Sequence, residues 1–302
     1  MEPALRDLPD PLSVLVTDSG LGGLSVCAEL AGRLGREGAF RRVALTYFNA
    51  WPEQDRGYNL LPADARIRAF DGALLGMARL RPDLILVACN TLSVLYPETR
   101  FSRAPAMPVI EILTLGVRML HALALARPES QVVLFGTPTT IASDAHRSRL
   151  VALGVDPGRI VAQACDRLAG EIEKDPDSAV VRGMIERYAG AAAARLADRG
   201  APVLAAFCCT HYNYSAGWFR QAFQGWPGPV TVVNPNDAMS GCLSPDPALP
   251  DRPGAELSVR VLSRIVLSGQ KVAAIAGRIR PVSARTAQAL VEYRHDPDLF
   301  AF

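Results

Sequence analysis

Lysine is almost absent from this sequence of 302 residues, although basic residues are not. Only Lys174 and Lys271 occur among the 32 lysines and arginines. A pyridoxal phosphate enzyme needs a lysine in its active site to form the Schiff base. One lysine lies in the charged stretch EIEKDPD and the other in the carboxyl-terminal region, and we expect neither at a catalytic cleft. Lysine usage therefore argues against this cofactor.

Other absences exclude further classes of protein. No G-x-x-x-x-G-K-S/T segment occurs, which excludes a P-loop, and no C-x-x-C or H-E-x-x-H spacing occurs, so we expect no metal site. The formal net charge is only +2, and no dense basic run lies among aromatic residues. We therefore expect no nucleic acid partner.

Long hydrophobic runs are missing as well. None approaches the roughly 18 residues that cross a bilayer. The amino terminus, MEPALRDLPDPL, lacks the basic and apolar segments of a secretory signal. These observations predict a cytoplasmic protein with no membrane partner.

Short apolar segments that end in small or polar residues are what the sequence does contain. Continuous apolar runs that alternate with helical patterns are typical of parallel sheets covered on both faces, and a chain of this length accommodates two domains. We therefore predict an α/β protein. The segments are LSVLVTDSG, VALTYFN, PDLILVACN, QVVLFGTP and PVLAAFCCT.

The spacing of the strand ends suggests that one unit occurs twice. Cys89 follows Asp18 by 71 residues (89 − 18), and Cys209 follows Thr137 by 72 (209 − 137). Ligands of parallel sheets bind at the carboxyl ends of the strands, so two facing units would bring both cysteines to one cleft. On spacing alone, a chance match of element lengths remains the alternative.

The glycines of VTDSGLGGLSV lie between a predicted strand and a helix, where backbone N–H groups can approach an anion. The dinucleotide fingerprint G-x-G-x-x-G/A fails because Ser25 occupies its last position, so a nicotinamide dehydrogenase is a weak match. Asp18 and Ser19 could cap the helix or take part in chemistry. The sequence alone leaves both roles open.

The six cysteines show no disulfide spacing, and we expect free thiols. Four of them are interpreted as small core residues, namely Cys27, Cys165, Cys208 and Cys242. Cys89 and Cys209 differ because hydrogen-bonding residues follow each at a strand end. Two such thiols suit the inversion of a stereocentre, in which one group removes a proton and the other delivers one to the opposite face.

Four segments, VTDSGLGGLSV, LILVACNTLSV, FGTPTTIAS and FCCTHYNY, resemble the signatures of the cofactor-independent aspartate/glutamate racemase superfamily, and most closely those of glutamate racemases. The resemblance spans residues 14 to about 240. It implies two pseudo-symmetric parallel-sheet α/β domains with the active site between them. We expect residues 12–115 plus 229–302 in the first domain and 116–228 in the second. It also implies a homodimer that needs no cofactor.

The resemblance further implies roles for individual residues. Cys89 and Cys209 would be the acid/base pair, with Asp18 assisting the first and His211 the second. Glu173 falls where the family often has a glutamate near the catalytic histidine. The residues expected to hold the carboxylate and ammonium groups of an amino acid are Ser19, Asn90, Thr91, Thr137, Thr140 and Thr210.

The sequence departs from the family in its specificity loop. NAWPEQDRG, residues 49–57, stands where glutamate racemases have GDTARVPYG, so Gly57 is kept as a substrate-binding candidate but Ala50 and Arg56 replace Asp and Tyr. Arg56 could bind a group of the substrate or point to solvent. Farther along, SPDPALPDRPGAE predicts a loop and LSVRVLSRIVLSG a helix.

The expected function is a racemase or epimerase that moves a proton at the α-carbon of a small-molecule amino acid, with glutamate or a related acidic amino acid as the first candidate. Superfamily relatives also include hydantoin racemases and decarboxylases of malonate-type acids, although two cysteines count against the latter. A catalytically silent ligand-binding protein is the alternative from another class.

Overall fold

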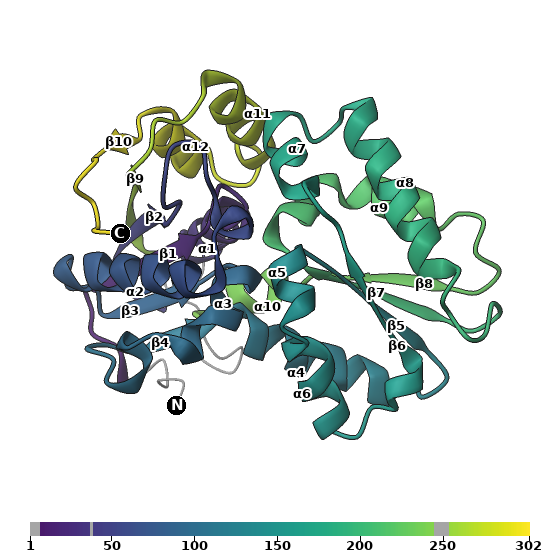
Figure 1. The fold of residues 1–302 in the computed structure, drawn as a ribbon. Coiled ribbons are helices and arrows are strands. Elements are labelled where there is room, and N and C mark those ends of the chain that lie inside the picture. Colours follow the sequence, from purple (N-terminus) through teal and green to yellow (C-terminus); the bar gives the residue numbers. More distant parts are fainter. Residues whose placement is uncertain (1–6, 37–38, 245–253) are drawn as a thin grey trace.

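A computed structural model describes residues 7–36, 39–244 and 254–302, and it contains two parallel sheets, one in each of two lobes (Figure 1). The predicted α/β class is confirmed. Among the helices in these ranges, none is long and apolar enough to cross a membrane.

The first lobe contains a six-stranded sheet in the order β10-β9-β2-β1-β3-β4. Its strands are β1 (Leu12–Asp18), β2 (Arg42–Asn49), β3 (Leu84–Val87), β4 (Val109–Glu111), β9 (Glu256–Ser263) and β10 (Arg294–His295). Its helices are α1 (Leu24–Leu34), α2 (Ala63–Arg79), α3 (Asn90–Leu95), α11 (Gly269–Ile279) and α12 (Ala284–Val291). Side chains of β1 alternate between the two faces. Val14 and Val16 pack in one cluster with α1, whereas Leu15 packs in another with α2.

The second lobe contains a four-stranded sheet in the order β6-β5-β7-β8. Its strands are β5 (Gln131–Gly136), β6 (Ile160–Ala164), β7 (Val203–Cys208) and β8 (Val230–Val233). One face packs against α7 (Leu168–Lys174), α8 (Ala179–Ala193) and α9 (Ala216–Ala222), the other against α4 (Ile112–Ala126) and α6 (Ala145–Ala152). The short α5 (Pro138–Ala142) follows β5, and the 3-10 helix η6 (Thr210–Ser215) follows β7.

The two sheets repeat one arrangement. The order β2-β1-β3-β4 in the first sheet matches β6-β5-β7-β8 in the second. Asp18 and Cys89 come at the ends of β1 and β3, and Thr137 and Cys209 follow the equivalent strands β5 and β7. The predicted repeat is therefore confirmed.

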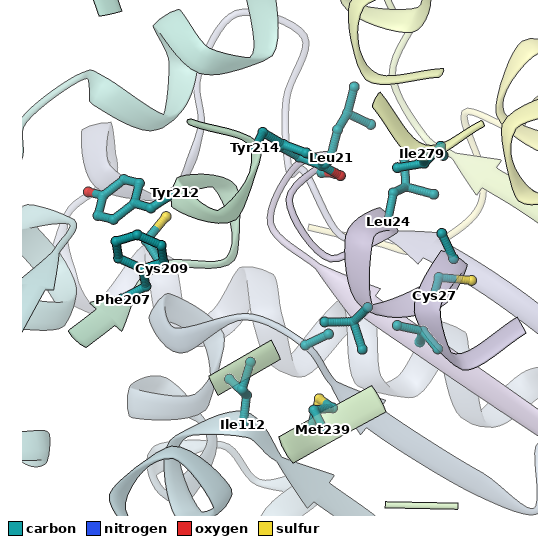
Figure 2. Packing of buried hydrophobic residues seen from close by; sticks show 14 of the residues in the cluster. Leu21, Leu24, Cys27, Ile112, Phe207, Cys209, Tyr212, Tyr214, Met239 and Ile279 are labelled. Carbon is teal, nitrogen blue, oxygen red and sulfur yellow. The ribbon is translucent and has the colours of Figure 1, made fainter. Parts of the chain in front are cut away.

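One apolar cluster continues from lobe to lobe. It includes Leu24 of α1, Ile279 of α11, Phe207 of β7 and Tyr212 of η6 (Figure 2). The short helix α10 (Pro235–Ser240) packs between the lobes against α1 and α4. The lobes thus share buried surface next to the strand ends that meet between them.

Two sequence-based expectations require correction. The chain was expected to return to the first domain at residue 229, but β8 pairs with β7, so the return follows β8. The segment expected as a helix, LSVRVLSRIVLSG, begins as strand β9, which pairs with β2. Leu257 and Val261 are buried on one face, and the alternate residue Ser258 is exposed, which is the period of a strand. Residues 245–253, most of the proline-rich stretch, lie outside the described residues.

The carboxyl-terminal residues close the core beneath α2. Phe300 is 2% exposed and its ring lies 5.7 Å from that of Phe48. The guanidinium of Arg264 lies over the Phe300 ring at 5.1 Å, and Arg79 donates a hydrogen bond to the carbonyl oxygen of Leu299 at 2.9 Å. This tail is therefore part of the folded domain.

Phe300→Ala should lower the free energy of unfolding by about 3 kcal/mol, because it leaves a cavity and removes the ring contacts. Phe302→Ala is the matched control. This phenylalanine is 41% exposed, so its removal should change stability by less than about 0.5 kcal/mol. Urea denaturation measures both, and equal effects of the two variants would contradict the packing described here.

Candidate active site

A cavity of about 550 Å³ lies between the lobes at the carboxyl ends of the strands. Its walls include both cysteines that the sequence singled out. The structure places ten of the expected site residues on it, namely Ser19, Gly57, Cys89, Asn90, Thr91, Thr137, Glu173, Cys209, Thr210 and His211. Asp18 and Thr140 lie directly behind this wall, in hydrogen-bond contact with Thr210 and Thr91.

Cys89 lies at the amino-terminal cap of α3. Its Sγ accepts a hydrogen bond from the backbone N–H of Leu92 at 3.4 Å, and the Ser19 hydroxyl lies 3.2 Å away. Burial raises the pKa of the Cys89 thiol well above its ordinary value, and the charge of Asp18 raises it further. Cys89 therefore rests as a protonated thiol, which is the form that can donate a proton.

Asp18 is fully buried at the end of β1. Burial raises its pKa to about 6, although the charge of His211 and a hydrogen bond from Thr210 oppose the shift. The Thr210 hydroxyl donates to Asp18 Oδ2 at 2.7 Å and links the two lobes. Gly23, not Asp18 or Ser19, occupies the cap position of α1, and no side chain caps this helix. The capping interpretation of the motif is therefore wrong.

Cys209, on the other side of the cavity from Cys89, lies beside a chain of charged side chains. His211 Nδ1 lies 3.6 Å from Cys209 Sγ, and His211 Nε2 lies 2.8 Å from Glu173 Oε1. The ammonium group of Lys271 donates to Glu173 Oε2 at 2.8 Å. Each cysteine therefore has its own set of polar neighbours.

The protonation of this chain follows from its contacts. Burial alone would lower the pKa of His211, but the hydrogen bonds and charges of Cys209 and Glu173 raise it well above its ordinary value. Burial would raise the pKa of Glu173, but contacts with His211 and Lys271 lower it to about 2. His211 is thus an imidazolium next to Cys209, and a neighbouring cation favours the thiolate form of a cysteine.

The glycine-rich turn after β1 does bind an anion, and the anion belongs to the protein. The backbone N–H of Leu21 donates to Glu173 Oε1 at 2.8 Å. A Cβ at Gly20 would lie 2.5 Å from Glu173 Oε1, and one at Gly22 would overlap the His211 ring. Glycine suits these two positions because side chains of the second lobe pack directly against the turn and leave no room for a Cβ.

Several polar side chains lie together beside Cys89 at the cavity wall. The hydroxyl oxygens of Thr91, Thr137 and Thr140 lie 2.9 to 3.2 Å apart and join the lobes. Asn90 Oδ1 lies 3.0 Å from Nε2 of buried His146. Asn90 Nδ2 is buried with no hydrogen-bond partner among the described residues, which leaves a donor at the cavity wall.

Arg56 is not brought to the cavity wall. Its guanidinium pairs with Glu53 at 2.8 Å, and about half of its side chain is exposed. Trp51 of the same loop lines the cavity instead, and its ring covers Gly57.

Both lysines line the cavity, so the expectation that neither lies at the cleft is wrong. Lys271 was missed because its partner Glu173 is 98 residues away in the sequence. Cys165, interpreted as a core residue, is buried but also reaches the cavity wall. Within the described ranges, no group of three His, Cys, Asp or Glu side chains could hold a metal ion.

Comparison with known proteins agrees with this architecture, although no family model matches the sequence. The chain is 30% identical over 238 residues to the glutamate racemase of Syntrophus aciditrophicus, covering 78% of this chain and 80% of that protein. It is 32% identical over 236 residues to the glutamate racemase of Granulibacter bethesdensis, covering 75% of each.

Solved structures share the fold. A glutamate racemase from Francisella tularensis, in complex with D-glutamate, superimposes with a TM-score of 0.64 at 19% identity, covering 90% of this chain and 95% of that one. A glutamate racemase from Campylobacter jejuni gives 0.65 at 21% identity, covering 89% and 97%. The fold and sequence together define a two-lobed α/β protein of the racemase class. The chain belongs to the aspartate/glutamate racemase superfamily, and the relatives named here are glutamate racemases.

Asp18→Asn should stabilise the protein at pH 8. Because the pKa of Asp18 is about 6 in the folded protein and 3.8 ordinarily, the folded state binds this proton more tightly. Stability therefore falls as the pH rises between these values and stays lower above them. The uncharged variant should be more stable than the wild type by about 3 kcal/mol at pH 8 and by less than about 1 kcal/mol at pH 4.

Urea denaturation at the two pH values measures this difference, with the wild type at pH 4 as the reference. A variant that is no more stable than the wild type at pH 8 would contradict the account of Asp18 as a buried, costly carboxylate.

Proposed function

We propose that this protein is a cofactor-independent racemase of an acidic amino acid, with glutamate as the first candidate substrate. The observation that carries the proposal is one cysteine from each lobe on the walls of a single cavity, each with its own polar partners. Such a pair suits proton removal on one face of a carbon and proton delivery on the other.

In the first step, the Cys209 thiolate takes the α-proton of the bound amino acid. The electron pair of the broken C–H bond moves into the carboxylate and forms an enediolate. In the second step, the Cys89 thiol gives its proton to the opposite face of the α-carbon, and the electron pair returns to form the new C–H bond. The opposite enantiomer reacts through the same steps in reverse.

A thiolate alone is too weak a base, because an α-proton is far less acidic than a thiol with an ordinary pKa of about 8.5. The enediolate must be stabilised by donors that are already in place. We assign this role to the free Nδ2 group of Asn90 and the hydroxyl group of Thr91, both of which lie at the cavity wall. Ser19 and Thr210 are proposed to contact the ammonium end of the substrate.

The names of the relatives support glutamate as the first candidate. The altered loop is proposed to contact the side chain of the substrate through Trp51 and Gly57, which line the cavity. Arg56 pairs with Glu53 outside the cavity. We therefore propose an acidic amino acid as the substrate without assigning the length of its side chain. The expected homodimer and cytoplasmic location also stay predictions, and analytical ultracentrifugation would test the first.

The direct test incubates the purified protein with single enantiomers of glutamate, aspartate and longer acidic amino acids and measures the other enantiomer by chiral chromatography. Conversion of at least one acid without an added cofactor supports the proposal. Carbon dioxide release from malonate derivatives, or thermal stabilisation by an amino acid without turnover, would contradict it.

Cys89→Ala and Cys209→Ala should each lower kcat for racemisation by at least about a thousandfold, since each removes one of the two proton-transfer groups. Cys208→Ala is the matched control. Cys208 precedes Cys209 but is buried in the apolar cluster on the far face of the sheet, away from the cavity. Full activity in either cavity-cysteine variant would sink the two-base mechanism.

A further inference from the structure

Lys271 occupies an unfavourable place in its own helix. It lies in the first turn of α11, where its backbone N–H donates to the capping Ser268 hydroxyl. A positive charge at a helix amino terminus opposes the helix dipole. The placement is therefore explained by an interaction outside α11 and not by a local preference.

That interaction is an ion pair with the buried Glu173. Lys271 Nζ lies 2.8 Å from Glu173 Oε2, and the carboxylate is only 3% exposed. The ammonium group also lies 5.5 Å from the centre of the Trp51 ring, whose face attracts cations. A second cavity of about 190 Å³, on the side of the β9–α11 connection, shares Trp51, Glu173 and Lys271 with the main cavity. Lys271 is thus fixed in the wall between the two cavities.

The three charges on this side of Cys209 do not cancel. With His211 as an imidazolium, Glu173 ionised and Lys271 protonated, the group carries a net charge of +1. Without Lys271, the carboxylate would neutralise the imidazolium, and Cys209 would face a group with no net charge. The lysine therefore offsets the charge of Glu173, so that more of the positive charge of His211 acts on the sulfur atom.

We propose that Lys271 is a positioning residue that acts through Glu173 and His211 to keep Cys209 a thiolate at neutral pH. The inference rests on the proposed racemase function for its catalytic meaning. The electrostatic relation among the four side chains can be measured without any substrate.

Other titratable groups also act on Glu173 and His211, and they remain unchanged when Lys271 is replaced. Asp18 of β1 is a carboxylate whose charge opposes that of Lys271. Other titratable groups near Glu173 in the described part of the chain include Tyr47 of β2, Tyr214 of η6, and Glu171 and Lys174 of α7. Burial raises the pKa of both tyrosines well above the ordinary value, so they stay neutral in the pH range tested.

The test measures the alkylation rate of Cys209 by iodoacetamide from pH 5 to pH 10, with the modified peptide identified by mass spectrometry. Lys271→Met should move the midpoint of the rate profile upward by about one pH unit, because a nearby cation favours the thiolate. Lys271→Arg keeps the charge and should keep the midpoint. If Lys271→Met fails to fold, Lys271→Gln takes its place.

Lys174→Met is the matched control, since it removes the only other lysine from the same cavity wall. Lys174 pairs with Glu171 at 2.7 Å and is half exposed, so its loss should leave the Cys209 midpoint in place. An unchanged midpoint in Lys271→Met, or an equal shift in Lys174→Met, overturns the proposal.

Catalysis provides the second readout. In Lys271→Met, the acidic limb of the kcat/KM profile should move to higher pH while the KM at the optimum stays within about twofold. A KM that rises with an unshifted profile would assign Lys271 to substrate binding instead and overturn the positioning role. If the wild type converts no amino acid but the alkylation midpoint shifts as expected, the proposed function fails and the electrostatic role stands.

Discussion

A buried carboxylate between the two lobes is the constraint on which this site depends. Glu173 comes from α7 of the second lobe, yet it accepts hydrogen bonds from Leu21 in the turn after β1 and from Lys271 of α11, both in the first lobe. Burying such a charge is costly unless it is fully paired. Its third partner, His211, lies beside Cys209. The contacts that satisfy the carboxylate therefore also hold the lobes together and hold the imidazolium of His211 next to Cys209.

The repeat supplies two cysteines, but the surroundings make them different. Burial and the charge of Asp18 keep Cys89 a thiol, although hydrogen bonds with the Ser19 hydroxyl and the Leu92 N–H oppose the shift in its pKa. Cys209 lies beside an imidazolium. A two-base racemase needs one thiol and one thiolate at the start of each turnover, and the proposed mechanism relies on this difference between the two cysteines. The same cavity can then accept either enantiomer once the proton has moved.

Much of this could be predicted from the sequence, and the failures have physical causes. Apolar runs ending at Cys89 and Cys209 predicted parallel strands with a polar edge, because strand burial and strand ends are local properties. Strand β9 was predicted as a helix because its apolar residues suit both periods, and only pairing with β2 decides between them. Arg56 was a candidate for substrate binding, but it pairs with Glu53, three residues away, and this local ion pair keeps its guanidinium off the cavity wall. Lys271 could not be foreseen, since nothing in its neighbourhood indicates the distant Glu173.

The central claim is that two different side chains act on opposite faces of one carbon, and the measurement that tests it most directly is deuterium incorporation in heavy water. Each enantiomer of the substrate is converted briefly, and the α-deuterium content of substrate and product is then determined. If the two cysteines act on opposite faces, the product carries deuterium while the remaining substrate does not, from either enantiomer. Equal early labelling of both would indicate a single base and contradict this claim.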